Sequence, residues 1–274
     1  ESAFWRLVPG ERAPWRRRVR AAVTERLNRA CVERSEISTF THDGYRRSLL
    51  RRHAERGHVV EASWIDHENV LDDAQLSGVI ERRSRHAGSL KLVFVGRLTP
   101  EKGLLVLLDA VESALREKVA VQLDIFGDGP LREECARRIR ALGESAPVQL
   151  RGTMPYDQRF FEAMRAYDAL VVPSISDEQP RVVFDAYAQG LPVIASRTEG
   201  LVQCVDDHVT GFLVAAGDHV ALRACIARLA ARPEPLAAMS RACVNRAQRL
   251  THRQMHRARW QLLVDRFPAL TRPP

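Results

Sequence analysis

The sequence has no apolar run near the roughly 20 residues that a helix needs to span a bilayer. Residues Glu1 to Trp15 carry charge and proline where a secretory signal would have an apolar segment. Internal repeats and low-complexity tracts are also absent. These absences predict a globular protein without a secretory signal or a membrane span. Because the chain begins with Glu and not with Met, we expect an N-terminal portion to be missing.

Cysteine is sparse and carries no motif. There are five cysteines, an odd number, and no two of them form a C-x-x-C pair. This pattern favours structural thiols in a reducing cytoplasm over a disulfide framework or a zinc site. We therefore expect a cytoplasmic protein. The cysteines are Cys31, Cys135, Cys204, Cys225 and Cys243.

Lysine is almost absent, and the positive charge is carried by arginine. The chain has 3 Lys and 39 Arg, and its formal net charge is +8. Residues 1–56 hold 14 Arg against 7 acidic residues, with the densest cluster at Arg16–Arg20. Three interpretations remain open: a solvated helix face, a contact with anionic lipid head groups, or a nucleic-acid patch. Because no aromatic residues interleave the cluster, nucleic acid is the least favoured partner.

Composition and periodicity indicate the fold class. Hydrophobic residues make up 45% of the 274 positions and charged residues 28%, which is typical of globular proteins. From Leu90 onward, short apolar runs alternate with helical segments such as Leu104–Val111. Near-continuously apolar strands between helices predict a doubly wound α/β domain, with helices on both faces of a parallel sheet. The six runs are Lys91–Gly96, Val121–Gly127, Val148–Gly152, Ala169–Ser174, Pro192–Ser196 and Gly211–Ala215.

The flanking segments have a different organisation. The N-terminal segment contains only two predicted strands, too few for an independent α/β domain. We expect residues 1–89 to be a partial N-terminal domain with its linker, 90–248 a Rossmann-like domain, and 249–274 a helix that packs back toward the N-terminal part. The elements expected outside 90–248 are a helix at Trp15–Val32, a strand at Ile37–Thr41, a helix at Tyr45–Glu55, a strand at His58–Ser63, a linker at Asp66–Ser89 and a helix at Met255–Phe267.

The first strand–helix junction is a candidate anion site. Thr99 is a suitable N-cap and Pro100 a suitable first helical residue, so we expect a helix to start directly after the strand. Free N–H groups at a helix start attract anions, and Arg97 and Lys102 add two positive charges. This loop follows the carboxyl end of a parallel strand, where open sheets bind ligands. A phosphate or diphosphate site is one interpretation, and an ordinary capped surface helix is the other.

Two later junctions carry further candidates. Asp177 precedes a predicted helix and Asp185 lies eight positions later, and carboxylates accept hydrogen bonds from vicinal sugar hydroxyls. By spacing alone, an N-capping Asp and an exposed helical Asp are equally good interpretations. The Thr198–Gly200 segment could offer backbone N–H groups to a pyrophosphate. Gly127–Pro130 is a tight turn that lacks the third glycine of a dinucleotide fingerprint.

Five ordered segments resemble a known family. The segments are "VFVGRLTPEKGLLVLLDAV", "LDIFGDGPLREE", "LRGTM", "LVVPSISDEQPRVVFDAYAQGLPVIAS" and "VTGFLVAAGD", between about Lys91 and Ala231. They look like the C-terminal domain of retaining glycosyltransferases of family 4, which have the GT-B fold. More weakly, "SEISTFTHDGYRRSLL" and "HVVEASWID" resemble the last strands of that family's N-terminal domain.

The resemblance assigns roles to particular residues. It implies that Arg97 and Lys102 hold the donor diphosphate and stabilise charge on the leaving group. Asp177 would orient the donor sugar and Asp185 the ribose, although the family usually has Glu at both positions. Pairing Asp185 with Glu178 instead is one residue short and turns the partner by roughly 100° on a helix. The donor-binding positions that complete the expected site are Gly96, Glu178, Thr198 and Gly200.

The implied activity is transfer of a sugar from a nucleoside diphosphate sugar to an acceptor with retention, without metal or other cofactor. The enzyme would resemble hexosyltransferases of polysaccharide or glycoconjugate biosynthesis, with a possible contact between the Arg-rich segment and an anionic membrane. Two alternatives are a catalytically incomplete nucleotide-sugar-binding module and a sugar-nucleotide epimerase. Glu199 stands where a small residue is usual, and its carboxylate would repel a diphosphate unless it points away. We expect this chain alone to transfer sugar poorly.

Overall fold

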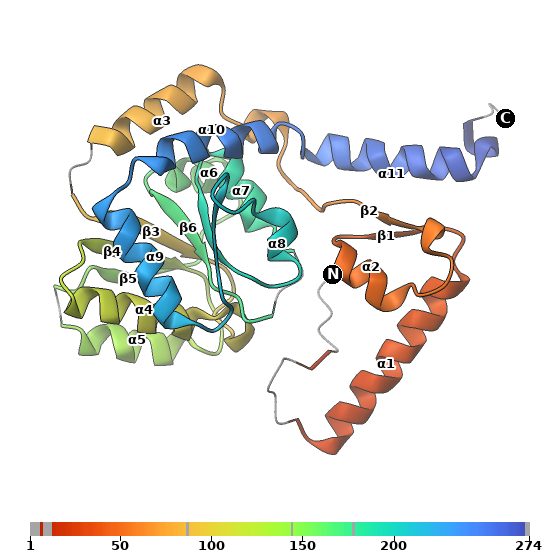
Figure 1. Cartoon of the computed structure of the whole chain (residues 1–274), viewed down its shortest axis with the longest axis horizontal. Coiled ribbons are helices and arrows are strands. Elements are labelled where there is room, and N and C mark those ends of the chain that lie inside the picture. Colours follow the sequence, from red (N-terminus) through yellow and green to blue (C-terminus); the bar gives the residue numbers. More distant parts are fainter. Residues whose placement is uncertain (1–5, 8–12, 86–87, 144, 177–178, 272–274) are drawn as a thin grey trace.

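The computed structural model describes residues 6–7, 13–85, 88–143, 145–176 and 179–271 (Figure 1). Its larger part is a six-stranded parallel sheet with the strand order β5-β4-β3-β6-β7-β8. The chain builds outward from β3 to β5 and then returns to place β6 on the other side of β3. The strands are β3 (Leu90–Val95), β4 (Val121–Phe126), β5 (Val148–Gly152), β6 (Ala169–Val172), β7 (Val193–Ser196) and β8 (Gly211–Val214).

Helices cover both faces of this sheet. Side chains alternate between the faces of a strand, so Leu92 and Phe94 join one buried cluster with α4 and α9, whereas Val93 joins the other with α6 and α7. The predicted doubly wound, GT-B-type Rossmann-like fold class is confirmed. The covering helices are α4 (Leu104–Arg116), α5 (Arg132–Ala141), α6 (Gln158–Met164), α7 (Val182–Ala188), α8 (Leu201–Cys204), α9 (His219–Ala231) and α10 (Pro235–Ala247).

A small second unit precedes this sheet. Its two strands pair in parallel, and a cluster of Phe40, Leu49 and Leu50 forms its core. The predicted helix Tyr45–Glu55 is wrong in its second half, because His53 adopts a left-handed conformation with φ 52° and a separate 3-10 turn (Ala54–Arg56) follows. The elements are α1 (Trp15–Arg34), β1 (Ser38–Phe40), α2 (Asp43–Leu49) and β2 (Gly57–Val59).

The segment expected to be a linker contains a helix. After a short 3-10 turn (His67–Asn69), α3 (Asp73–Arg85) packs against α10, where Leu76 and Val79 share a buried cluster with Val244. The sequence is polar enough to read as a linker because only one narrow stripe of α3 is buried. The contact with α10 supplies the burial that stabilises this helix.

The last helix, α11 (His252–Arg266), leaves the sheet domain and runs past the small unit in Figure 1. The Thr251 hydroxyl accepts from the Gln254 N–H, and the His252 N–H donates to the Ile65 carbonyl at 2.8 Å. Near its other end, Arg266 forms an ion pair with Glu36. A 3-10 turn (Pro268–Thr271) follows. All five cysteines are free thiols, and four of them are buried.

Candidate functional site

Three loops that carry predicted site residues leave neighbouring strands. β3, β6 and β7 are adjacent in the sheet, and the chain changes direction between β3 and β6. Loops at the carboxyl ends of parallel strands lie at one edge of the sheet, and in open α/β sheets such a change of direction is where ligands bind. The tertiary structure thus brings the Arg97, Asp185 and Thr198 segments to one edge of the sheet.

The loop after β3 differs from the prediction of an immediate helix. Thr99 precedes a 3-10 turn of three residues, Pro100–Lys102, and its hydroxyl donates to the Glu101 carboxylate at 2.7 Å instead of capping a helix. The α-helix starts only at Leu104. Arg97 and Lys102 therefore lie on a separate turn in front of α4.

Gly103 explains the break between the turn and α4. Its φ is +68°, and a Cβ there would lie 1.9 Å from the carbonyl oxygen of Pro173. Only glycine tolerates both the left-handed backbone and this close approach. The Ile175 N–H donates to the Glu101 carbonyl at 2.9 Å, which fastens the loop after β6 to the loop after β3. The glycine after the basic pair is visible in the sequence, but only the structure shows the Pro173 carbonyl that it faces.

Of the basic pair, Arg97 is the more exposed residue. The Arg97 side chain is 68% exposed, and its guanidinium lies 3.6 Å from the Glu101 carboxylate. Lys102 is half-buried one turn away. An exposed ion pair of this kind contributes little to stability, so the Arg97 guanidinium is available to exchange Glu101 for a phosphate.

Asp185 is buried, unlike the exposed helical Asp that its spacing also allowed. It lies on α7 with 5% of its surface exposed, and its Oδ1 accepts from the Tyr156 hydroxyl at 2.8 Å. Burial raises the pKa of Asp185 to about 7, partly offset by the Tyr156 hydrogen bond and the Arg181 guanidinium. A carboxylate at this edge with so perturbed a pKa is characteristic of a functional group.

The loop between β6 and α7 also contacts the small unit. The Gln179 side chain accepts from the Ala62 N–H at 2.7 Å, and the Arg181 guanidinium lies 3.9 Å from the centre of the Trp64 ring. These contacts bring the small unit against the start of α7. Asp177 and Glu178, the two predicted sugar-side carboxylates, lie outside the described residues.

The third loop, after β7, places Glu199 against the small unit. Thr198 and Gly200 precede α8, and the Leu201 N–H donates to the Thr198 hydroxyl at 3.4 Å. A Cβ added to Gly44 would lie 2.8 Å from Glu199 Oε2, so the Glu199 carboxylate lies directly against α2. The Glu199 side chain therefore lies between this loop and the small unit.

His42 precedes α2, close to Glu199. It is buried, and its Nδ1 accepts from the Tyr45 N–H at the start of α2. Burial lowers the pKa of His42, while the Glu199 carboxylate acts in the opposite direction. The neighbouring Asp43 N–H donates to the Gln203 side chain at 2.9 Å, which ties α2 to α8.

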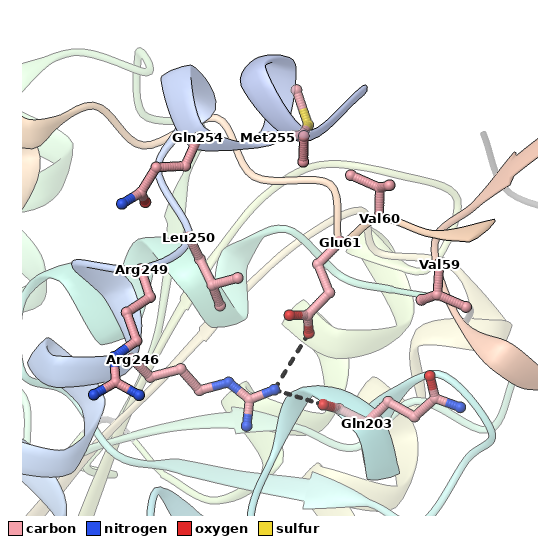
Figure 2. A pocket seen from close by; sticks show the side chains of 10 residues that line it. Val59, Val60, Glu61, Gln203, Arg246, Arg249, Leu250, Gln254 and Met255 are labelled. Atoms are coloured by element: carbon pink, nitrogen blue, oxygen red, sulfur yellow. Dashed lines mark hydrogen bonds and ion pairs between the residues drawn. The ribbon is translucent and has the colours of Figure 1, made fainter. Parts of the chain in front are cut away.

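A cavity of about 400 Å³ lies elsewhere, between β2, α10 and the start of α11 (Figure 2). Arg246 crosses it and contacts the Glu61 carboxylate at 3.2 Å and the Gln203 carbonyl at 2.6 Å. Burial raises the pKa of Glu61, and Arg246 offsets part of that effect. None of the described predicted site residues lines this cavity, so it is a junction between the two units and not the expected donor site.

Sequence reasoning missed Tyr156, Gly44 and Arg246. Each of these residues contacts a partner that is far away in the chain, and such a partner cannot be predicted from local sequence spacing. A tyrosine after Pro155 in a strand–helix loop is an ordinary surface residue until the structure places its hydroxyl on Asp185.

Within the described ranges, no group of three or more His, Cys, Asp or Glu side chains is placed to hold a metal ion. Over the same part of the chain, the helices are all too short or too polar to cross a bilayer.

Two curated relatives are similar to a little over half of this chain. D-inositol 3-phosphate glycosyltransferase of Segniliparus rotundus is 36% identical over 164 residues, which cover 58% of this chain and 36% of the relative. D-inositol 3-phosphate glycosyltransferase 2 of Catenulispora acidiphila is 38% identical over 168 residues, which cover 58% of this chain and 39% of the relative. The chain thus spans well under half the length of these relatives.

Solved structures share the fold. Alr3699/HepE of Anabaena in complex with UDP superposes with a TM-score of 0.74 at 19% identity, over 89% of this chain and 68% of that one. Sucrose-phosphate synthase of Thermosynechococcus elongatus superposes with a TM-score of 0.70 at 23% identity, over 90% and 62%. The family described as Glycosyl transferases group 1 matches residues 89–232, just over half of the chain. The chain belongs to the group 1 glycosyl transferases.

Proposed function

We propose that this chain is the donor-binding part of a retaining glycosyltransferase of family 4, which transfers a sugar from a nucleoside diphosphate sugar to an acceptor. The observation that carries the proposal is that the exposed Arg97, the half-buried Lys102 and the buried carboxylate of Asp185 follow adjacent strands, β3 and β6, at the switch point of a doubly wound sheet. Cationic groups bind diphosphate, and a buried carboxylate orients sugar hydroxyls. The Anabaena neighbour, whose structure contains UDP, is consistent with this assignment.

In this proposal each residue has one task. Arg97 and Lys102 bind the diphosphate and stabilise the charge that develops on it as the sugar leaves, which requires no metal ion. Asp185 binds the ribose, and the backbone of Thr198 and Gly200 contributes N–H donors to the phosphates. Asp177 would orient the sugar. Retention follows only from the resemblance, and no side chain is assigned as a nucleophile.

The decisive experiment compares ligands that differ in their phosphates. Arg97→Ala and Lys102→Ala should each weaken uridine diphosphate binding by about 1.5–3 kcal/mol, roughly 10- to 150-fold, and leave uridine binding nearly unchanged. Isothermal titration measures both affinities. Arg241→Ala, an exposed arginine on α10, is the matched control and should change neither. Equal diphosphate affinity in parent and both variants would remove the pair from the site.

Binding without efficient transfer is a second candidate for this chain by itself, favoured by the small N-terminal unit. That unit has two strands, and none of the Trp15–Arg34 residues of α1 is buried. Transfer requires the acceptor to be held in line with the donor, usually between two complete domains. We expect donor binding to survive and multi-turnover transfer with candidate acceptors to be slow.

We also propose that α1 contacts an anionic membrane at its cytoplasmic face. Four large apolar side chains recur at every fourth position and are exposed, namely Trp15, Val19, Val23 and Leu27. Exposed arginines at 16, 18, 20 and 26 lie among them. Apolar side chains that insert between lipids, combined with arginines that pair with head groups, are the ordinary elements of an interfacial helix.

A further inference from the structure

Tyr156 forms a hydrogen bond with Asp185, the carboxylate that binds the ribose in the proposed function. Its hydroxyl donates to Asp185 Oδ1 at 2.8 Å. A tyrosine hydroxyl and a ribose hydroxyl offer the same chemistry, an O–H donor on a carbon framework. With the phenol in place, one of the two oxygens of Asp185 is already used.

The position of Tyr156 allows it to move. The residue is 52% exposed and lies in the loop between β5 and α6, whereas Asp185 is buried on α7. Its ring touches Phe160 and Phe161 on one side, with ring centres 5.4 Å apart in each case. Because the ring is half-exposed and lies on a loop, it can turn toward solvent by giving up its contacts with Phe160 and Phe161. The carboxylate on the packed helix α7 cannot follow it.

Asp185 offers little accessible surface to a ligand. Only 5% of the residue is exposed, and its Oδ1 already accepts from the Tyr156 hydroxyl, so a ligand hydroxyl competes with the phenol for that oxygen. The phenol also compensates a group whose burial is costly: removing it without replacement leaves a buried carboxylate unsatisfied. Exchange of one O–H donor for another avoids that cost.

We propose that Tyr156 takes the place of the donor's ribose, an inference that rests on the proposed function. When no nucleotide is bound, the Tyr156 hydroxyl donates to the Asp185 carboxylate. When a nucleotide binds, the ribose hydroxyls displace it. Tyr156 thereby sets nucleotide affinity. Each binding event breaks the Tyr156–Asp185 hydrogen bond, so the net gain from the ribose contact is small. A chain without the phenol hydroxyl makes the same ribose contact and breaks nothing.

The test is Tyr156→Phe with three probes measured by isothermal titration. Uridine diphosphate should bind about tenfold more tightly to the variant than to the parent. For 2′,3′-dideoxyuridine diphosphate, which lacks the ribose hydroxyls, and for inorganic pyrophosphate, the two chains should have equal affinities. Tyr167→Phe is the matched control, because the Tyr167 hydroxyl makes the same kind of bond to Asp124 at 2.7 Å. Tyr167→Phe should change none of the three affinities.

A second measurement needs no variant. In the parent chain labelled with ring-¹³C tyrosine, saturation with uridine diphosphate should shift one of the tyrosine resonances, whereas pyrophosphate should leave all of them in place. Unchanged tyrosine resonances under uridine diphosphate would overturn the proposal.

Two further results would contradict the inference. One is a Tyr156→Phe chain that binds uridine diphosphate equally or less tightly, and the other is a gain that is equal for the dideoxy compound. If the parent binds neither uridine diphosphate nor pyrophosphate, the proposed function itself fails, and this inference fails with it. That result differs from the first two, in which the parent binds both ligands.

Discussion

Replacing Asp185 by Asn should make the protein more stable at neutral pH, and by an amount that depends on pH. The carboxylate is 5% exposed, and burial raises its pKa to about 7 from an ordinary value near 3.8. At about 1.36 kcal/mol for each unit of pKa, keeping this group ionised in the folded state costs about 4 kcal/mol. The isosteric amide removes that cost and can still accept from the Tyr156 hydroxyl.

The direction of the pH dependence follows from proton binding. Between pH 4 and 7 the folded chain keeps the Asp185 proton, whereas the unfolded chain has released it. The contribution of Asp185 to the stability of the parent therefore falls as pH rises through this window, and the loss is complete above pH 7. The Asp185→Asn variant lacks this dependence. Its advantage over the parent should grow by about 2–3 kcal/mol between pH 5 and pH 8.

Urea denaturation of both chains at pH 5, 6.5 and 8 measures this difference. Glu133→Gln, which removes an exposed carboxylate on α5, is measured alongside as the matched carboxylate-to-amide control. If the advantage of the Asp185→Asn variant stays flat from pH 5 to 8, the reasoning is refuted, because Asp185 then titrates alike in the folded and unfolded states. A variant that gains stability and loses uridine diphosphate affinity would show that the buried charge is retained for binding.

Two further perturbations test the junction and the surface. Arg246→Met leaves the partly buried Glu61 without its cation and should lower the free energy of unfolding by about 2 kcal/mol. The loss is smaller than for a fully buried ion pair because about a fifth of the Arg246 side chain is exposed. Arg241→Met on the same helix should change it by less than about 0.5 kcal/mol in urea melts, and equal effects would show that the Glu61 contact adds nothing. The chain should sediment with vesicles that contain anionic lipid, and the bound fraction should decrease as salt increases. Replacing the arginines of Arg16–Arg20 with Gln should abolish this sedimentation. Equal binding to neutral vesicles would exclude an electrostatic contact.

The sheet edge at which the candidate site lies can largely be predicted from local sequence patterns. Apolar runs of strand length separated by helical segments predict parallel strands, and the carboxyl ends of such strands share one edge. The strand order confirms that the loops carrying Arg97, Asp185 and Thr198 leave neighbouring strands. The five strand–helix motifs indicated a glycosyltransferase, and the match to the group 1 glycosyl transferases confirms that level of the assignment. Prediction from local patterns failed at Pro100, where a helix was predicted, because the contact between Gly103 and the Pro173 carbonyl forces a separate turn. It also failed for Asp66–Ser89, where burial against α10 produces helix α3.

By itself, the sequence determined the parallel sheet, its helical layers and the strand ends from which the site loops leave, because side-chain periodicity and strand–helix connection are local rules. Only the tertiary structure decided the state of the side chains in those loops. Asp185 is buried and paired with Tyr156, and Glu199 lies against Gly44, because segments remote in the chain pack together there. Burial and hydrogen-bond partners set the pKa and the availability of a carboxylate, and both depend on neighbours that no local spacing specifies.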